Sequence, residues 1–178
     1  EPSNPWMAGV AGVFTVEFPH ILRLIEGTQF DTIYHEHFTY LSLLAVRRIF
    51  EAHGLSIFRV EPLTTHGGSL RVFTARTEAG YPVEDSVAQV IGDEVAAGLD
   101  NPAGYAGFDA RVRAVRAELL DFLANARREG RKVAAYGGAA KGNTLLNYCG
   151  VTREDIAAIG NTSRLDGAWR VCRSPEQL

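Results

Sequence analysis

The chain has 178 residues, of which 46% are hydrophobic and 22% are charged, with a formal net charge of −3. This length allows one hydrophobic core or two small ones, and this composition excludes an intrinsically disordered protein. The charges are interspersed, and no apolar run is long enough to cross a bilayer, so we expect neither a nucleic-acid partner nor a membrane partner. The chain has two cysteines, Cys149 and Cys172, which could form at most one disulfide bond. Small secreted proteins are usually stabilised by several disulfides, so this count predicts a reducing, cytoplasmic compartment.

The first half of the chain has the pattern of an α/β sheet. The chain begins with Glu1 and contains one methionine, Met7, so we expect it to be a piece of a longer protein. In chain order we predict a strand at 12–18, a short helix at 21–27, a helix at 43–53 capped by Ser42, strands at 55–60 and 69–74, and a turn at 64–68. The short connection between the last two strands favours an antiparallel pair, and therefore the end of an α/β sheet with an antiparallel edge.

The second half begins after a break at Gly80 and Pro82, where we place a domain boundary. We predict helices at 84–97 and 108–128, a strand at 131–136, a glycine-rich loop at 137–143, a helix at 144–148 and a strand at 156–159. Thr152 and Asp155 have the spacing of a helix capping box. A strand, a helix and a second strand in this order predict a parallel sheet.

The first chemical motif is a run of titratable residues between Tyr34 and Tyr40. His35, Glu36 and His37 stand together in an otherwise apolar and aromatic segment. Histidine changes its charge closest to neutral pH, and a neighbouring carboxylate can orient it. A strand would place Tyr34 and Glu36 on one face, whereas a helical turn would make Tyr34 and His37 neighbours, and the sequence leaves both open.

Two glycine motifs follow. The segment 136–143 reads Tyr-Gly-Gly-Ala-Ala-Lys-Gly-Asn and lies between a predicted strand and a predicted helix. Glycines let a backbone approach a ligand, and free amides at a helix start favour phosphate, but the spacing is neither that of a dinucleotide fingerprint nor that of a P-loop. A plain tight turn is the alternative. The shorter motif, His66-Gly67-Gly68, also needs no ligand to explain it.

Together, the motifs at 34–37, 65–71 and 136–150 resemble the C-methyltransferases that act on nucleotide-linked deoxysugars. The resemblance fades after Gly150. It implies a zinc-binding part and an S-adenosylmethionine-binding glycine-rich loop that precede Glu1. It also implies that residues 1–80 are the C-terminal part of the class I methyltransferase domain, with a Rossmann-like sheet. Residues 81–178 would then be a second, C-terminal Rossmann-like α/β domain that binds substrate.

The resemblance also implies roles for individual residues. The substrate would be a 4-keto-deoxysugar linked to a nucleotide. His37 would remove the proton next to the ketone, Glu36 would orient His37, and Tyr34 would donate a hydrogen bond from its hydroxyl. The sugar nucleotide would be bound by a second set of residues: His66, Gly67, Lys141, Gly142 and Asn143.

Two other functions are compatible with the same residues. The chain could bind a sugar nucleotide without chemistry, because the methyl-donor site is expected elsewhere. It could also be a metal enzyme, since His35 and His37 have a spacing that suits one ion and His20 could be a third ligand. We rank the metal enzyme last and expect no metal site in this chain.

Overall fold

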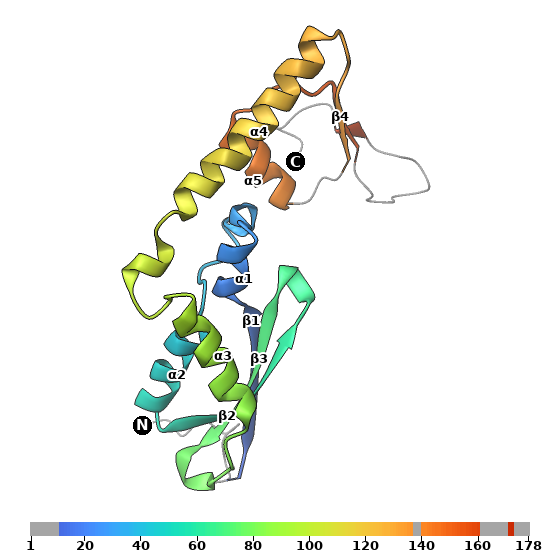
Figure 1. Ribbon diagram of the computed structural model, residues 1–178. Helices are drawn as coiled ribbons and strands as arrows, with labels where there is room; N and C mark the ends of the chain where they lie inside the picture. Colours follow the sequence, from blue (N-terminus) through green and yellow to red (C-terminus); the bar gives the residue numbers. More distant parts are fainter. Residues whose placement is uncertain (1–10, 137–139, 161–170, 173–178) are drawn as a thin grey trace. The chain divides into compact units, whose positions relative to one another are not determined.

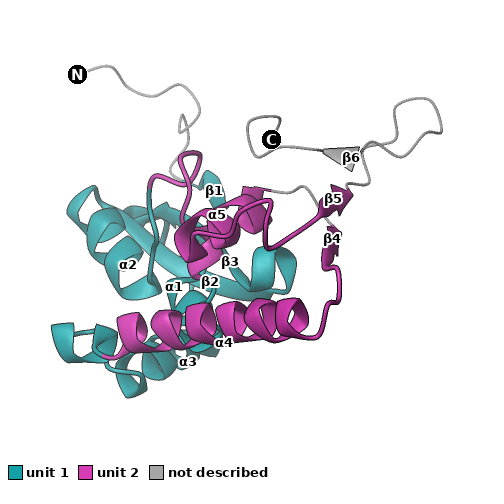
Figure 2. Ribbon diagram, turned by 90° about the horizontal axis from the view of Figure 1, so that it is seen from above, with its two compact units in different colours: residues 1–29, 39–106 teal, residues 30–38, 107–178 magenta. Residues whose placement is uncertain are grey.

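The computed structural model describes residues 11–136, 140–160 and 171–172 (Figure 1). The chain is α/β and divides into two compact units. The first unit contains residues 1–29 and 39–106, and the second contains residues 30–38 and 107–178 (Figure 2). The units therefore divide at a different place from the boundary predicted at residue 80, and the segment with the titratable run belongs to the second unit.

The first unit contains a three-stranded sheet built from β1 (Val13–Pro19), β2 (Leu55–Leu63) and β3 (Ser69–Arg76). The strand order is β1-β3-β2, and β3 is antiparallel to both neighbours. The predicted antiparallel pair is thus confirmed, but the antiparallel strand lies in the middle of this sheet and not at its edge. The reason is that the connection holding α1 (Ile21–Glu26) and α2 (Leu43–Ala52) brings β2 back parallel to β1 and leaves room for β3 between them.

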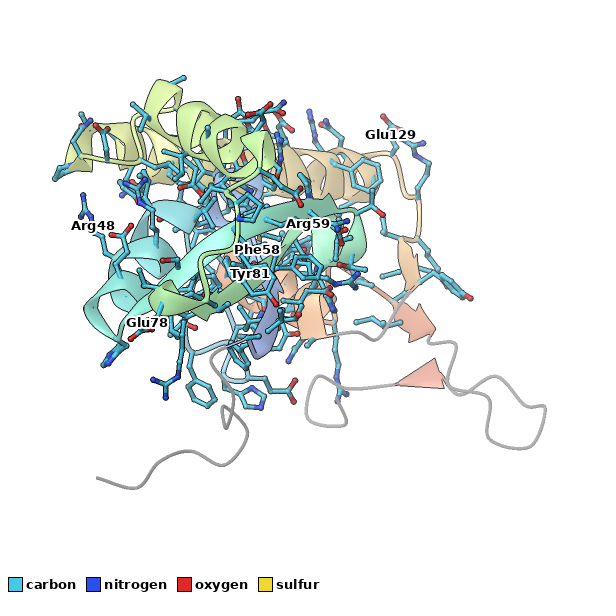
Figure 3. All side chains as sticks on the ribbon, turned by 90° about the horizontal axis from the view of Figure 1, so that it is seen from below. Arg48, Phe58, Arg59, Glu78, Tyr81 and Glu129 are labelled. Carbon is cyan, nitrogen blue, oxygen red and sulfur yellow. The ribbon has the colours of Figure 1, made fainter. Side chains whose placement is uncertain are left out.

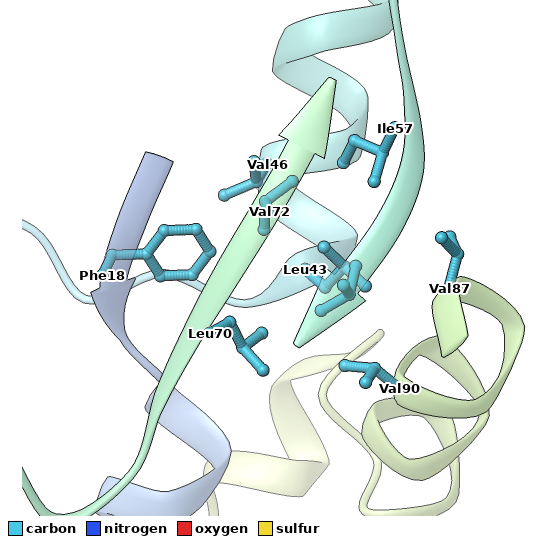
Figure 4. Close-up of a cluster of buried hydrophobic side chains, with 9 residues drawn as sticks. Phe18, Leu43, Val46, Ile57, Leu70, Val72, Val87 and Val90 are labelled. Atoms are coloured by element: carbon cyan, nitrogen blue, oxygen red, sulfur yellow. The ribbon is translucent and has the colours of Figure 1, made fainter. Parts of the chain in front are cut away.

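Helices α2 and α3 (Asp85–Ala96) pack on this sheet and close the core of the first unit. The core consists of aliphatic side chains and one phenylalanine (Figure 4): Phe18, Leu43, Val46, Ile57, Val60, Leu70, Val72, Val87 and Val90. Leu70 and Val72 alternate along β3, as a strand with one buried face requires. Because α3 contributes to this core, it belongs with the strands and not with the helix that follows it.

Strand β2 contains a bulge that exposes an aromatic cluster. Its register with β3 shifts between Ile57 and Arg59, which leaves Phe58 without a partner residue. The Phe58 ring stacks on Tyr81 (Figure 3), with a centroid distance of 4.7 Å. The Arg59 guanidinium lies 5.1 Å from the centroid of the Phe73 ring. Glu84 N donates to Phe58 O over 2.8 Å, so the segment before α3 is attached to the outer side of the bulge.

The second unit is built around α4 (Phe108–Arg128), α5 (Ala140–Cys149) and a small sheet. The sheet consists of β4 (Ala134–Tyr136), β5 (Ala158–Gly160) and β6 (Val171–Cys172). Strands β4 and β5 are parallel with α5 between them, which confirms the predicted strand–helix–strand unit, and β6 is antiparallel to β5. The helix predicted at 144–148 in fact begins at Ala140, so Lys141, Gly142 and Asn143 lie in its first turn and not in a loop.

Short 3-10 turns connect these elements. They are η2 (Phe30–Thr32), η3 (Thr65–Gly67), η4 (Thr77–Ala79) and η5 (Pro102–Tyr105). Within the second unit, η2 packs against α5, and the rings of Phe30 and Tyr148 lie 5.0 Å apart. More than a hundred positions separate these two residues in the chain, so no local pattern could predict this packing.

Candidate functional site

A backbone turn brings Tyr34 and His37 together. His37 N donates to Tyr34 O over 2.9 Å, and the centroids of the two rings lie 4.2 Å apart at an interplanar angle of 36°. Of the two geometries that the sequence leaves open, the structure has the turn, in which residues three apart are neighbours. Both side chains are half-buried.

The orientation of His37 is set by a backbone carbonyl. Nδ1 of His37 lies 2.7 Å from Thr32 O. Because a carbonyl oxygen only accepts hydrogen bonds, Nδ1 must carry the proton, and in the neutral ring Nε2 is then the nitrogen with the free lone pair. The turn therefore holds one tautomer of His37, with Nε2 as its basic atom.

The side chain of Glu36 lies next to His35 and makes no hydrogen bond to the neighbouring His37 ring in the described structure. Its Oε1 lies 3.8 Å from Nε2 of His35, and the two side chains are 69% and 87% exposed. The orienting contact that sequence reasoning assigned to Glu36 is made instead by the carbonyl of Thr32. No sequence pattern could identify this contact, since every residue carries a carbonyl.

The His66-Gly67 motif forms the turn η3 in the first unit. His66 is exposed and has a φ of 54°, and Gly67 has a φ of 84°. Left-handed backbone of this kind favours glycine and is uncommon for histidine. Gln29 Nε2 donates to Gly67 O over 3.0 Å, and His20 N donates to Gly68 O over 3.0 Å, so the turn is attached to the residues on either side of α1.

The second glycine motif begins α5. Lys141, Gly142 and Asn143 are partly exposed, and Asn143 Oδ1 accepts a hydrogen bond from Asn147 Nδ2 at 2.9 Å. The first amides of an α-helix have no partner within the helix, and the helix dipole adds partial positive charge there. Gly137 and Gly138 of the same motif lie outside the described residues.

The second unit thus contains both the Tyr34–His37 turn and the first turn of α5, because η2 packs against α5. The turn with His66 and Gly67 belongs to the first unit.

The ligands expected for a metal enzyme have other partners. His20 is 4% exposed, and its Nε2 donates to Glu94 Oε1 over 2.7 Å. His37 Nδ1 contacts the Thr32 carbonyl, and His35 contacts Glu36. Across residues 11–136, 140–160 and 171–172, no group of three or more His, Cys, Asp and Glu side chains could hold a metal ion.

The structure also reveals a buried cluster that the sequence did not predict. Both oxygens of Glu94 accept backbone hydrogen bonds at the start of α2, from Leu43 N over 2.6 Å and from Leu44 N over 2.8 Å. Ser42 Oγ accepts from Ala45 N over 3.1 Å, which confirms the predicted cap. Glu94 could be found only by noting a lone acid among the apolar positions of α3.

The described part of the chain is an α/β fold in which a turn holds His37 in one tautomer, with Nε2 as its basic nitrogen. The family model described as the C-methyltransferase C-terminal domain matches residues 64–166. The chain therefore belongs to the C-methyltransferase C-terminal domain family. The match extends beyond Gly150, where we expected the resemblance to fade.

A curated relative agrees with this family. The C-methyltransferase NovU of Streptomyces niveus is 37% identical to the chain over 154 residues, which are 86% of this chain and 37% of that protein. The chain thus spans little more than a third of the length of the relative. None of the helices in the described part of the chain is both long and apolar enough to span a membrane.

Proposed function

We propose that this chain is part of an S-adenosylmethionine-dependent enzyme that methylates a carbon of a nucleotide-linked 4-keto-deoxysugar. The family match and the similarity to NovU support C-methylation. The observation that carries the chemistry is the contact of His37 Nδ1 with the Thr32 carbonyl at 2.7 Å, because it leaves Nε2 as a base. We keep the predicted cytoplasmic location as part of this proposal.

His37 removes the proton from the carbon next to the ketone. The ketone makes this proton acidic, since the electron pair of the broken C–H bond passes into an enolate. The proton moves to Nε2, while Nδ1–H stays bonded to the Thr32 carbonyl. S-adenosylmethionine supplies the methyl group that the enolate carbon attacks, with its sulfur leaving as a neutral thioether.

Tyr34 stabilises the enolate. Its ring packs against that of His37 in the same turn, with the ring centroids 4.2 Å apart. A hydroxyl donor aimed at the substrate oxygen stabilises negative charge as that charge develops, and this is the kind of interaction that accelerates a reaction. Glu36 then acts only as a nearby negative charge, because the Thr32 carbonyl already orients the ring.

The remaining site residues bind the nucleotide-linked sugar. Lys141 contributes a positive charge at the first turn of α5, the backbone amide of Gly142 is among the first amides of the helix, which have no acceptor within it, and Asn143 contributes its side-chain amide. Such a helix start, with its partial positive charge, suits a diphosphate. We also propose His66 and Gly67, in η3 of the first unit, as contacts of the sugar nucleotide.

We assign the methyl donor and zinc to no described residue. The family resemblance implies that both are bound before Glu1. We also keep, as a proposal about the domains of the intact enzyme, the assignment of 1–80 to the end of a class I methyltransferase domain and of 81–178 to a Rossmann-like substrate domain. The compact units of this chain differ from it, because α3 lies in the first unit. The match at residues 64–166, to a model described as a C-terminal domain, overlaps the second assignment and begins before residue 81.

The decisive experiment separates deprotonation from methyl transfer. The intact enzyme is incubated with a nucleotide-linked 4-keto-deoxysugar in deuterated water without S-adenosylmethionine, and deuterium uptake next to the ketone is followed by mass spectrometry. His37→Asn keeps a donor close to the position of Nδ1 but has no atom at Nε2. We expect it to lose deuterium exchange and methyl transfer by about 10²- to 10⁴-fold, with little change in substrate Kd.

His35→Asn is the matched control, because His35 is the exposed neighbour in the same segment. We expect it to exchange deuterium at nearly the parent rate. Exchange by His37→Asn at the rate of the control would eliminate His37 as the base. Binding of the sugar nucleotide by the parent with no exchange at all would favour a binding module instead.

A further inference from the structure

The side chain of Gln29 lies between two glycines at the C-terminal end of α1. Its Nε2 donates to Gly67 O over 3.0 Å. A Cβ added at Gly67 would lie 2.6 Å from Gln29 Oε1, and a Cβ added at Gly27 would lie 2.9 Å from Gln29 Nε2. Both distances are shorter than real Cβ contacts, so a side chain at either position would displace the amide end of Gln29 from where it lies.

The backbone around Gln29 is itself held in place. Gln29 N donates to Leu24 O over 2.9 Å, and Thr28 N donates to Ile25 O over 3.2 Å. Thr28 has a φ of 49°, an uncommon conformation for a β-branched residue. These two backbone hydrogen bonds hold the turn at Thr28 and Gln29, and the turn directs the side-chain amide of Gln29 toward η3.

The contact restrains the His66-Gly67 turn, together with the bond from Gly68 N to Thr65 O at 2.9 Å. The Gly67 carbonyl belongs to the peptide unit between Gly67 and Gly68, one residue after His66, whose φ of 54° is left-handed. A bond to this carbonyl favours one orientation of that peptide unit and so restrains the turn that carries His66. The other side of the turn is closed by Arg23, since a Cβ at Gly68 would lie 2.6 Å from Arg23 Cγ.

We propose that Gln29 is a positioning residue, which holds the His66-Gly67 turn in the conformation that binds the nucleotide-linked sugar. This inference rests on the proposed function, because it takes His66 and Gly67 as contacts of that substrate. Gln29 does not touch the reacting atoms. It acts on binding, so its loss raises KM for the sugar nucleotide and leaves the chemical step unchanged.

The test uses Gln29→Glu in the intact enzyme. Glutamate has the shape of glutamine but no donor, and it places a carboxylate against the Gly67 carbonyl. We expect KM and Kd for the nucleotide-linked sugar to rise about tenfold, as for a lost hydrogen bond of typical strength. The kcat, the Kd for S-adenosylmethionine and the melting temperature should remain close to those of the parent.

A second pair of variants tests the close approach of the Gln29 side chain to the backbone of Gly67. Gly67→Ala forces a Cβ against Gln29, whereas Gly80→Ala adds a Cβ at a similar φ of 66° with nothing within 4 Å. Gly80→Ala shows the effect of a similar backbone strain away from this turn. Gly67 is itself a proposed contact of the sugar nucleotide, so the part of its effect that depends on Gln29 is measured by a double-mutant cycle. The effect of Gly67→Ala on KM should be smaller in a Gln29→Ala background than in the parent.

Three results would overturn the proposal. One is a Gln29→Glu enzyme with the KM of the parent. Another is a loss of kcat and melting temperature in proportion to KM, which would indicate general destabilisation. The third is a parent enzyme that neither binds nor converts a nucleotide-linked sugar. This last result removes the proposed function as well, whereas an active parent with an unaffected Gln29→Glu variant removes only the role of Gln29.

Discussion

His20 and Glu94 form a buried hydrogen bond in the first unit, with His20 Nε2 at 2.7 Å from Glu94 Oε1. The two residues are 74 positions apart in the chain. Glu94 is fully buried, and its two oxygens also accept hydrogen bonds from the amides of Leu43 and Leu44. One carboxylate on α3 therefore caps α2 and binds the residue that precedes α1.

Removal of this carboxylate should loosen the start of α2. We expect Glu94→Ala to lower the free energy of unfolding by about 3 kcal/mol, because it leaves a buried histidine and two buried amides without a partner. Glu94→Gln should cost less, about 1–2 kcal/mol, since it keeps the shape and one acceptor. Asp93→Ala, at the exposed neighbouring position, is the control.

Amide hydrogen exchange provides a local measurement of the same effect. The amides of Leu43 and Leu44 should exchange faster in Glu94→Ala, whereas Ala45 N should be less affected because Ser42 Oγ accepts its hydrogen bond. Equal acceleration at all three amides would mean that the helix unfolds as a whole and that Glu94 has no specific role as a cap.

Cys149 should react slowly with alkylating reagents in the folded protein. Burial raises the pKa of the Cys149 thiol, and the positive charge of Arg116 acts in the opposite direction. A raised pKa means less thiolate at a given pH, and the side chain is only 2% exposed. Peptide mapping after iodoacetamide treatment, with and without denaturant, should show labelling of Cys149 only in the unfolded chain.

The same shift predicts a pH dependence of stability. The folded chain keeps the neutral thiol to a higher pH than the unfolded chain does. The associated stabilisation is therefore complete below the ordinary thiol pKa and is lost as the pH rises through the folded value. Cys149→Ala should have a flatter stability profile in that alkaline range, and an identical slope for both proteins would contradict this.

Asp155 should stabilise the turn before β5 in a pH-dependent way. Hydrogen bonds from the backbone and then the hydroxyl of Thr152 lower the pKa of the Asp155 carboxyl, with a smaller contribution from Arg127. The two bonds to Asp155 Oδ2 are 2.9 and 3.0 Å long. They have the pattern of a capping box, although the structure has no helix at this point.

A lowered pKa contributes stability above the ordinary carboxyl pKa and loses it as the pH falls through the folded value. We expect Asp155→Asn to cost about 0.5 kcal/mol near neutral pH, a small value because solvent screens this site. The difference from the parent should vanish in acid. A carboxyl titration by NMR at the ordinary aspartate value would refute the shift.

Glu36→Gln should leave catalysis almost intact. Glu36 is exposed, contacts His35 and does not orient His37, so we expect kcat to fall less than about threefold, as for the loss of a solvent-exposed charge pair. A loss of a hundredfold or more would mean that Glu36 turns toward His37 when substrate binds. His35→Asn, which removes the other partner of the pair, should behave like Glu36→Gln.

The sequence by itself determined several of the helices and strands. Ser42 caps α2 as expected, α4 spans the predicted 108–128, and β2 and β3 form the predicted antiparallel pair. These features depend on contacts between residues close in the chain, namely a cap, an apolar stripe and a short connection, so the local pattern is sufficient to predict them.

Only the tertiary structure decided which atoms act on one another. The segment 30–38 joins α5, the carbonyl of Thr32 selects the tautomer of His37, and Gln29 holds Gly67. The tertiary structure also decided that β3 lies at the centre of its sheet, between β1 and β2. Each of these results depends on backbone groups or on residues distant in the chain. Every residue carries a carbonyl and an amide, so the partner of each one is set by packing and leaves no signal in the sequence.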